Sequence, residues 1–126
     1  MPLTYSIDPT AGVLHVVGEG VINQAERLAA IRSWMRDPAY RRGLRTLCDF
    51  SAAVSTPRLS ELREIVSLIQ LQSPFIGPKR LAMVTPSSTV FGVARQFQAL
   101  AGSSPLEIGI FRDRALAVQW LGLETP

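Results

Sequence analysis

Short strand-type segments alternate along this chain with helix-type segments, and this alternation is the strongest constraint on its fold. The five strand-type segments are residues 3–7, 13–17, 44–50, 80–85 and 106–111. Most of the sequence between them repeats apolar residues every three or four positions, as on one face of a helix. Strands that alternate with helices pair in parallel through right-handed crossovers. The sequence therefore predicts an α/β fold.

The first two strands are an exception, because only the turn-forming residues 8–12, with the sequence DPTAG, separate them. A connection that short predicts an antiparallel hairpin. We therefore expect a mixed sheet of five strands in which the first is antiparallel and the rest are parallel. The chain has no internal repeat or linker-like tract, so residues 1–126 are expected to form a single domain with one core.

Capping residues predict where the helices begin and end. Asn23 is expected to cap the first helix, and Asp37 with Pro38 to stop it. Thr56 before Pro57 suggests the start of the second helix, which should end near Ser73. The other expected caps are Ser87 or Ser88 and Gly102 for the third helix, and Asp113 and Gly122 for the fourth.

Each predicted strand has one apolar face and one more polar face. The apolar positions are Leu14, Val16, Leu44, Cys48, Leu81, Met83, Leu106, Ile108 and Ile110. The opposite positions include His15, Arg45, Asp49, Arg80, Glu107 and Gly109. A sheet that is buried equally on both faces should not be this polar on one of them. We therefore expect about four helices, packed mainly on one face.

Composition and charge argue against several classes of protein. The net charge is +3, but twelve arginines and one lysine are spread among ten acidic residues, and the densest basic stretch, residues 41–45, follows a single aromatic residue. We therefore expect no nucleic-acid partner. No apolar run approaches the roughly 20 residues of a membrane span. The single cysteine, Cys48, excludes an intrachain disulfide, and a cytoplasmic location is expected.

The sequence shows no catalytic or metal-binding pattern. Nucleophilic catalysis needs a histidine beside a serine or cysteine. The only histidine, His15, lies in the middle of a predicted strand, and Cys48 lies on an apolar face. Asp49 and Asp113 are expected near one sheet edge without a histidine to complete a metal site. We expect no enzymatic activity, no cofactor and no metal.

Candidate binding residues follow the strands, because ligands of open α/β sheets tend to bind outside the carboxyl ends of parallel strands. The candidate phosphoacceptor or anion-binding residues are Ser51, Ser55, Thr56, Ser87, Ser88 and Arg112. The alternative is that these hydroxyl groups only cap helices. Phe75 and Ile76 lie between prolines in an expected loop. They either tuck under the sheet edge or form an exposed surface for a partner.

Three stretches of the sequence carry a family resemblance: DPAYRRGLRTLCDFSAAV, RLAMVTPSSTVFGVARQFQAL and IFRDRALAVQWLG. Together with the hairpin they resemble the SpoIIAA-like family of small bacterial proteins, which is related to STAS domains and more distantly to the CRAL-TRIO fold. The resemblance covers nearly the whole chain. It implies a sequentially ordered β-α superhelix and a regulatory or protein-binding role.

STAS domains of the anti-anti-sigma type are switched by phosphorylation of a serine at the start of the helix after the third strand. Residues 49–51, Asp-Phe-Ser, match the Asp-Leu-Ser of that family, but residues 56–59, Thr-Pro-Arg-Leu, stand where the family has Asp-Ser-Ser-Gly. Ser55 or Thr56 would then be the phosphate acceptor, since a phosphate is favoured at a helix N-terminus.

Two interpretations of function remain open. The first is a protein-interaction module, which should be well packed with no sizeable cavity. The second is a domain that binds a small molecule or lipid in a pocket between sheet and helices near Phe75, Phe91 and Phe111, with a volume of several hundred cubic ångströms. An enzyme completed by oligomerisation is a weaker third interpretation. The edge strand 3–7 suggests a homodimer.

Overall fold

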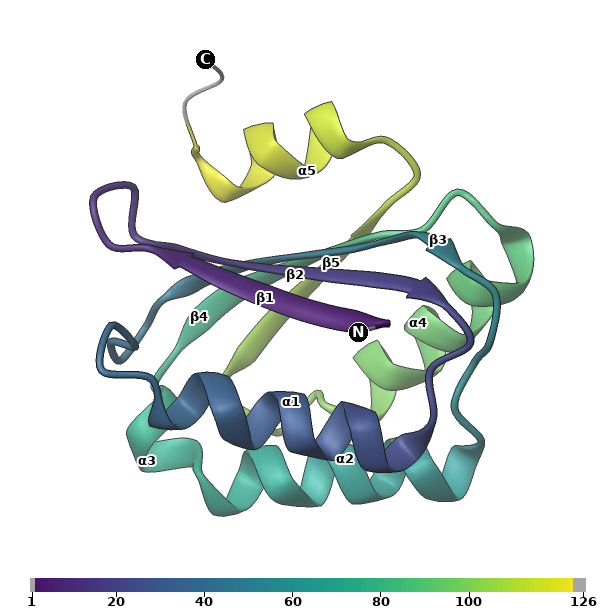
Figure 1. Cartoon of the computed structure of the whole chain (residues 1–126), viewed down its shortest axis with the longest axis horizontal. Helices are drawn as coiled ribbons and strands as arrows, with labels where there is room; N and C mark the ends of the chain where they lie inside the picture. Colours follow the sequence, from purple (N-terminus) through teal and green to yellow (C-terminus); the bar gives the residue numbers. More distant parts are fainter. Residues whose placement is uncertain (1, 124–126) are drawn as a thin grey trace.

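The computed structural model describes residues 2–123, which form five strands and five helices (Figure 1). The strands are β1 (Leu3–Asp8), β2 (Val13–Gly20), β3 (Arg45–Ala53), β4 (Lys79–Val84) and β5 (Leu106–Phe111). The helices are α1 (Gln24–Arg36), α2 (Leu59–Leu71), α3 (Ser73–Ile76), α4 (Ser88–Leu100) and α5 (Arg114–Leu121). No helix within this part of the chain is long and apolar enough to cross a bilayer.

The five strands form one mixed sheet in the order β1-β2-β3-β4-β5. β1 pairs with β2 antiparallel, and every other neighbouring pair is parallel. The predicted fold class is therefore confirmed, including the sequential strand order that the family resemblance implied. β1 lies at one edge of the sheet; pairing of this strand across a dimer stays a prediction.

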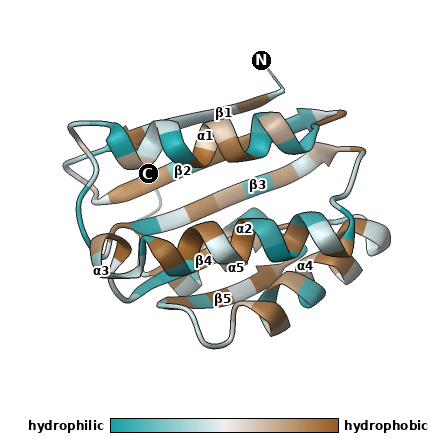
Figure 2. Cartoon of the chain, turned by 90° about the horizontal axis from the view of Figure 1, so that it is seen from below, coloured by the Kyte–Doolittle hydropathy of each residue, from teal (hydrophilic) through white to brown (hydrophobic). Residues whose placement is uncertain are grey.

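The helices form two unequal layers (Figure 1). α1, α2, α3 and α4 lie across one face of the sheet, whereas α5 alone covers the other face. Figure 2 shows the larger layer from below, with α1, α2 and α4 in front of the strands. The expectation that the helices pack mainly on one face is confirmed.

α5 packs on the more polar face because this face also has a small apolar centre. Val13, Leu47 and Ala82 are buried there against Ala117 and Leu121 of α5. The arginines of the same face bind the carboxyl end of this helix. Arg45 donates a hydrogen bond to the Leu121 carbonyl at 2.9 Å, and Arg80 donates to the Trp120 carbonyl at 2.8 Å. Free carbonyls at a helix C-terminus favour cations in this way.

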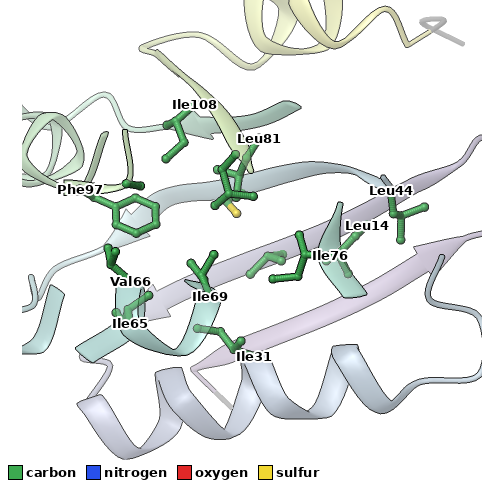
Figure 3. Packing of buried hydrophobic residues seen from close by; sticks show 14 of the residues in the cluster. Leu14, Ile31, Leu44, Ile65, Val66, Ile69, Ile76, Leu81, Phe97 and Ile108 are labelled. Carbon is green, nitrogen blue, oxygen red and sulfur yellow. The ribbon is translucent and has the colours of Figure 1, made fainter. Parts of the chain in front are cut away.

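The main core lies between the sheet and the larger helical layer (Figure 3). Leu14, Leu81 and Ile108 point into it from three strands, as the strand alternation predicted. Ile69 of α2 and Phe97 of α4 meet them from the helices. Cys48 is buried in the same cluster, on the apolar face of β3 as expected.

Most predicted helix caps are confirmed. Asn23 accepts a hydrogen bond from the Glu26 amide at 2.8 Å, and Asp113 accepts one from the Ala115 amide at 2.7 Å. Ser87 caps α4, and Gly122 ends α5 in the left-handed conformation. These contacts join residues at most three positions apart, so the local sequence is sufficient to specify them.

Some local predictions were wrong. α2 begins at Leu59, not at Thr56 and Pro57, because the Glu61 carboxylate accepts a hydrogen bond from the Arg58 amide at 2.8 Å. β3 continues to Ala53 because it pairs with the far end of β2. Gly102 does not have a left-handed backbone, because α4 ends at Leu100 and its C-cap is Ala101, with φ −88°.

Thr85 provides a first test of the packing. Its side chain is fully buried, and its hydroxyl has no hydrogen-bond partner among residues 2–123. An unpaired buried hydroxyl is destabilising, so Thr85→Val should raise the free energy of unfolding by about 1 kcal/mol. Urea denaturation measures this change, and the exposed Thr10→Val is the matched control. A loss of stability in Thr85→Val would contradict the prediction.

Candidate functional site

A cavity of about 160 Å³ lies between the sheet and helices α1, α2 and α4. Its lining is almost entirely apolar, and several of the lining side chains, such as Ile31, Ile65 and Phe97, are labelled in Figure 3. The helices contribute Ile31, Trp34, Leu62, Ile65, Ala94 and Phe97, among others. Close-packed protein interiors have few voids larger than a water molecule. This cavity is therefore the leading candidate for a ligand site in the described chain.

β3 forms the long wall of the cavity. Its alternate residues Thr46, Cys48 and Phe50 line the space, as expected for side chains on one face of a strand. Gly18 on the neighbouring strand leaves room for Phe50, because a Cβ atom there would lie 2.6 Å from Phe50 Cδ1. Ala53, at the carboxyl end of β3, also lines the cavity.

One end of the cavity is polar. The Lys79 Nζ atom donates hydrogen bonds to Thr46 Oγ1 at 2.9 Å and to the Tyr40 hydroxyl at 3.3 Å. It also lies 5.5 Å from the centre of the Tyr40 ring, within range of a cation–π interaction. Lys79 and Thr46 lie near the amino ends of β4 and β3. The polar end is thus opposite to the strand carboxyl ends at which we expected a ligand.

Burial determines the electrostatics of this end. It lowers the pKa of Lys79 to about 8, and it raises the pKa of Tyr40 and of Cys48 to about 12 each. At neutral pH the phenol and the thiol are therefore protonated, and the ammonium is the charged group. No carboxylate of residues 2–123 lies within 4.0 Å of Lys79. The cavity thus contains a cation that has no counter-ion within the described chain.

The other end of the cavity reaches residues 55–57, which precede α2. Ser55 accepts a hydrogen bond from the Ile22 amide at 2.8 Å and donates to the Ile22 carbonyl at 3.2 Å. Arg27 also lines this end, where it lies 3.9 Å from the Glu61 carboxylate. Since α2 starts at Leu59, neither Ser55 nor Thr56 stands at a helix N-terminus.

The remaining hydroxyl candidates make local contacts. Ser51 is part of β3 and not of a loop, and it donates to the Asp49 carboxylate at 2.6 Å. Ser87 accepts from the Val90 amide at 3.4 Å as the cap of α4, and Ser88 is the exposed first residue of that helix. Phosphorylation of these residues stays a prediction.

Arg112 also bonds within the protein. It donates to the Pro86 carbonyl at 3.0 Å, and its guanidinium carbon lies 4.4 Å from the centre of the Phe91 ring. The side chain therefore joins the loop after β5 to the start of α4. No candidate from the strand-end loops other than Ser55 and Thr56 lines the cavity.

Phe75 and Ile76 do not share one environment. Ile76 is buried in the main core, whereas Phe75 is 47% exposed. The Phe75 ring stacks on Tyr40 with a centroid distance of 5.3 Å and an interplanar angle of 14°. Ile76 is thus tucked into the protein, whereas Phe75 is exposed, so each of the two alternatives applies to one of these residues. Both residues belong to the one-turn helix α3, where we expected a loop.

The cavity lies elsewhere than predicted. Phe75, Phe91 and Phe111 do not line it. Phe111 points to the opposite face of the sheet and packs on Trp120 of α5, with a centroid distance of 5.5 Å. Strand alternation accounts for this, because the neighbouring Ile110 is the residue that faces the main core.

Tyr40, Thr46 and Lys79 were missed as candidates. Two signals in the sequence point to Thr46 and Lys79. Thr46 is a polar residue between Leu44 and Cys48 on an apolar strand face, and Lys79 is the only lysine beside twelve arginines. Neither signal shows that the two side chains meet.

His15 and Cys48 do not lie together as a catalytic pair in the structure. Val16, not His15, pairs with Cys48, so the two side chains point to opposite faces of the sheet. Burial and the nearby Arg114 lower the pKa of His15. Residues 2–123 contain no cluster of three or more His, Cys, Asp or Glu side chains that would hold a metal ion.

The sequential mixed sheet and its unequal helical layers define an α/β domain with a SpoIIAA-like fold. A solved structure of an uncharacterized protein from the DUF3478 family, with a SpoIIAA-like fold, from Shewanella loihica PV-4 superposes with a TM-score of 0.61. The two sequences are 14% identical, and the match covers 94% of this chain and 91% of that chain. At this identity the similarity establishes the fold. No protein-family profile and no curated protein matches the sequence.

Proposed function

We propose that this domain binds a small apolar molecule in the cavity between the sheet and helices α1, α2 and α4, without catalysing a reaction on it. The observation that carries this proposal is the cavity itself, about 160 Å³ within an otherwise packed core. Apolar cavities of about this size stay dry and take up apolar molecules the size of benzene. A ligand of about six to eight non-hydrogen atoms would fit on the same scale.

The cavity favours this function over a protein-interaction module, which should have no sizeable cavity. Its volume is below the several hundred cubic ångströms that we expected of a ligand domain, but its few convergent polar groups are as expected. The residues expected at a partner surface support that module only in part, because Phe75 is exposed but Ile76 is buried. Two of the candidate anion-binding residues are also engaged within the protein. The Ser55 and Arg112 side chains donate hydrogen bonds to the protein's own backbone.

Filling the cavity tests the proposal. Ala94 is buried on α4 and lines the cavity, whereas Ala99 is exposed on the same helix. Ala94→Leu should weaken the binding of 1-hexanol about tenfold or more, because the added methyl groups occupy the ligand's space. Ala99→Leu should bind 1-hexanol like the unmodified protein.

Titration of ¹⁵N-labelled protein with 1-hexanol, followed by amide chemical shifts, measures both affinities. The shifts should concentrate on residues that line the cavity, such as Cys48 and Phe97. Equal affinities in the two variants, or no saturable shift in the unmodified protein, would contradict the proposal.

A further inference from the structure

We propose that the ligand is a monocarboxylate with an unbranched apolar tail, whose carboxylate binds to Lys79 and Tyr40 at the polar end of the cavity. This inference rests on the proposed function and adds the chemical class of the ligand. The tail would extend from this end along β3, between the sheet and the helices.

The main argument is the charge of Lys79. Its ammonium contacts two neutral hydroxyl groups, those of Thr46 and Tyr40. The surrounding lining, which includes Ile76, Leu81 and Leu106, is apolar. Lys79 is half-buried, and a lysine in such a position is usually paired, because an isolated charge is costly to remove from water. An anion at this point would supply the counter-ion that residues 2–123 do not.

The hydrogen-bonding groups fit a carboxylate. An ammonium group has three N–H donors, and two of those of Lys79 are used on Thr46 and Tyr40. Thr46 in turn donates to the Leu44 carbonyl at 3.2 Å. The Tyr40 hydroxyl accepts from Lys79, which leaves its own proton available. One N–H and one O–H thus remain for the two oxygens of a carboxylate.

A ligand with a single negative charge fits this site better than a phosphate ester, which carries up to two. The other cation that lines the cavity, Arg27, lies toward the opposite end beside the Glu61 carboxylate and donates to the Ile22 carbonyl at 2.7 Å. Lys79 is therefore the one unpaired cation among the described lining residues. A dianion would leave one charge without a partner in an apolar space.

The lining residues of β3 provide a path for a linear tail. Thr46, Cys48 and Phe50 line it in succession along one strand, and Ala53 extends the wall toward the far end. A cavity of 160 Å³ takes about six to eight non-hydrogen atoms. Hexanoate, with eight such atoms, is therefore the probe of choice, and 1-hexanol is its neutral counterpart.

Lys79→Met and Lys79→Arg test the role of the charge. Hexanoate should bind the unmodified protein about tenfold or more tightly than it binds Lys79→Met, because a charge-assisted hydrogen bond is lost. Lys79→Arg keeps the charge and should restore part of the affinity. 1-Hexanol should bind all three proteins within about threefold of each other, since its tail contacts are the same. Circular dichroism confirms that each variant is folded.

The single lysine gives a direct spectroscopic readout. Protein labelled with ¹³C-lysine shows only the Lys79 side chain, and its Cε–Hε signal should shift on addition of hexanoate but less on addition of 1-hexanol. This measurement needs no variant, so it remains informative if Lys79→Met does not fold.

The outcomes separate this inference from the proposed function. Equal binding of hexanoate to the unmodified protein and Lys79→Met, with no shift of the lysine signal, overturns the carboxylate assignment and leaves the cavity as a site for neutral molecules. Failure of 1-hexanol to bind the unmodified protein overturns the proposed function as well.

Discussion

Replacing Leu14 with alanine should lower the free energy of unfolding by about 3 kcal/mol. Leu14 lies on β2 with 0% of its surface exposed, in the main core beside Val16 and Leu44. The substitution removes three buried carbon atoms and leaves a space that the paired backbone of β1, β2 and β3 prevents from closing. Equilibrium denaturation in urea, followed by circular dichroism, measures the change.

Leu71→Ala is the matched control for this prediction. Leu71 is the last residue of α2, and 78% of its surface is exposed. The same chemical change at this position should alter the free energy of unfolding by less than about 0.5 kcal/mol. Similar losses in the two variants would show that the burial of Leu14 does not determine the effect.

Lys79→Met should raise the free energy of unfolding by about 2–3 kcal/mol at pH 7, in the absence of ligand. The reason is the burial of the Lys79 ammonium, which lowers its pKa in the folded protein from 10.5 to about 8. Methionine has a similar length and carries no charge, so it fits the apolar lining without that cost.

The stabilising effect of Lys79→Met should disappear as the pH rises. Between pH 8 and about 10.5 the unfolded chain holds a proton on Lys79 that the folded protein has lost. As the pH rises through this window, the free energy of unfolding of the unmodified protein therefore increases relative to that of Lys79→Met. Above pH 10.5 the two proteins should be equally stable.

The comparison between the two proteins isolates Lys79 from other groups that titrate at high pH. Burial raises the pKa of Cys48 and Tyr40 to about 12, so both groups ionise first in the unfolded chain and destabilise either protein at high pH. Urea denaturation at several pH values from 7 to 10.5 measures the difference. A constant difference between unmodified protein and Lys79→Met would contradict the assignment, as would a difference that grows with pH.

Stability and binding are linked at this position. If the unpaired ammonium of Lys79 lowers the free energy of unfolding of the free protein, a carboxylate that pairs with it should raise that free energy again. Ligand binding should then stabilise the unmodified protein more than Lys79→Met. A buried cation that costs stability when the cavity is empty is thus consistent with a role in binding.

The candidate site was predictable only in part. The sequence resemblance implied the SpoIIAA-like fold, and the strand alternation predicted where the main core lies. Because ligands of open α/β sheets tend to bind at the carboxyl ends of the strands, we expected the site there. The polar end of the cavity instead lies near the amino ends of β3 and β4, at Thr46 and Lys79. The prediction was wrong because this tendency applies to ligands bound beyond the ends of the strands, whereas this cavity lies over the face of the sheet.

Features that depend on near neighbours along the chain were predictable from local sequence patterns. Side-chain alternation placed Leu14 and Cys48 on one face of the sheet, and Asn23 and Asp113 capped their helices, because these patterns act within one strand or one helical turn. The contacts of Lys79 with Thr46 and Tyr40 depend on the folding of the whole domain, since these residues are 33 and 39 positions away along the chain. Such contacts are set by how strands pair and how helices pack across the whole domain, and no local pattern encodes them.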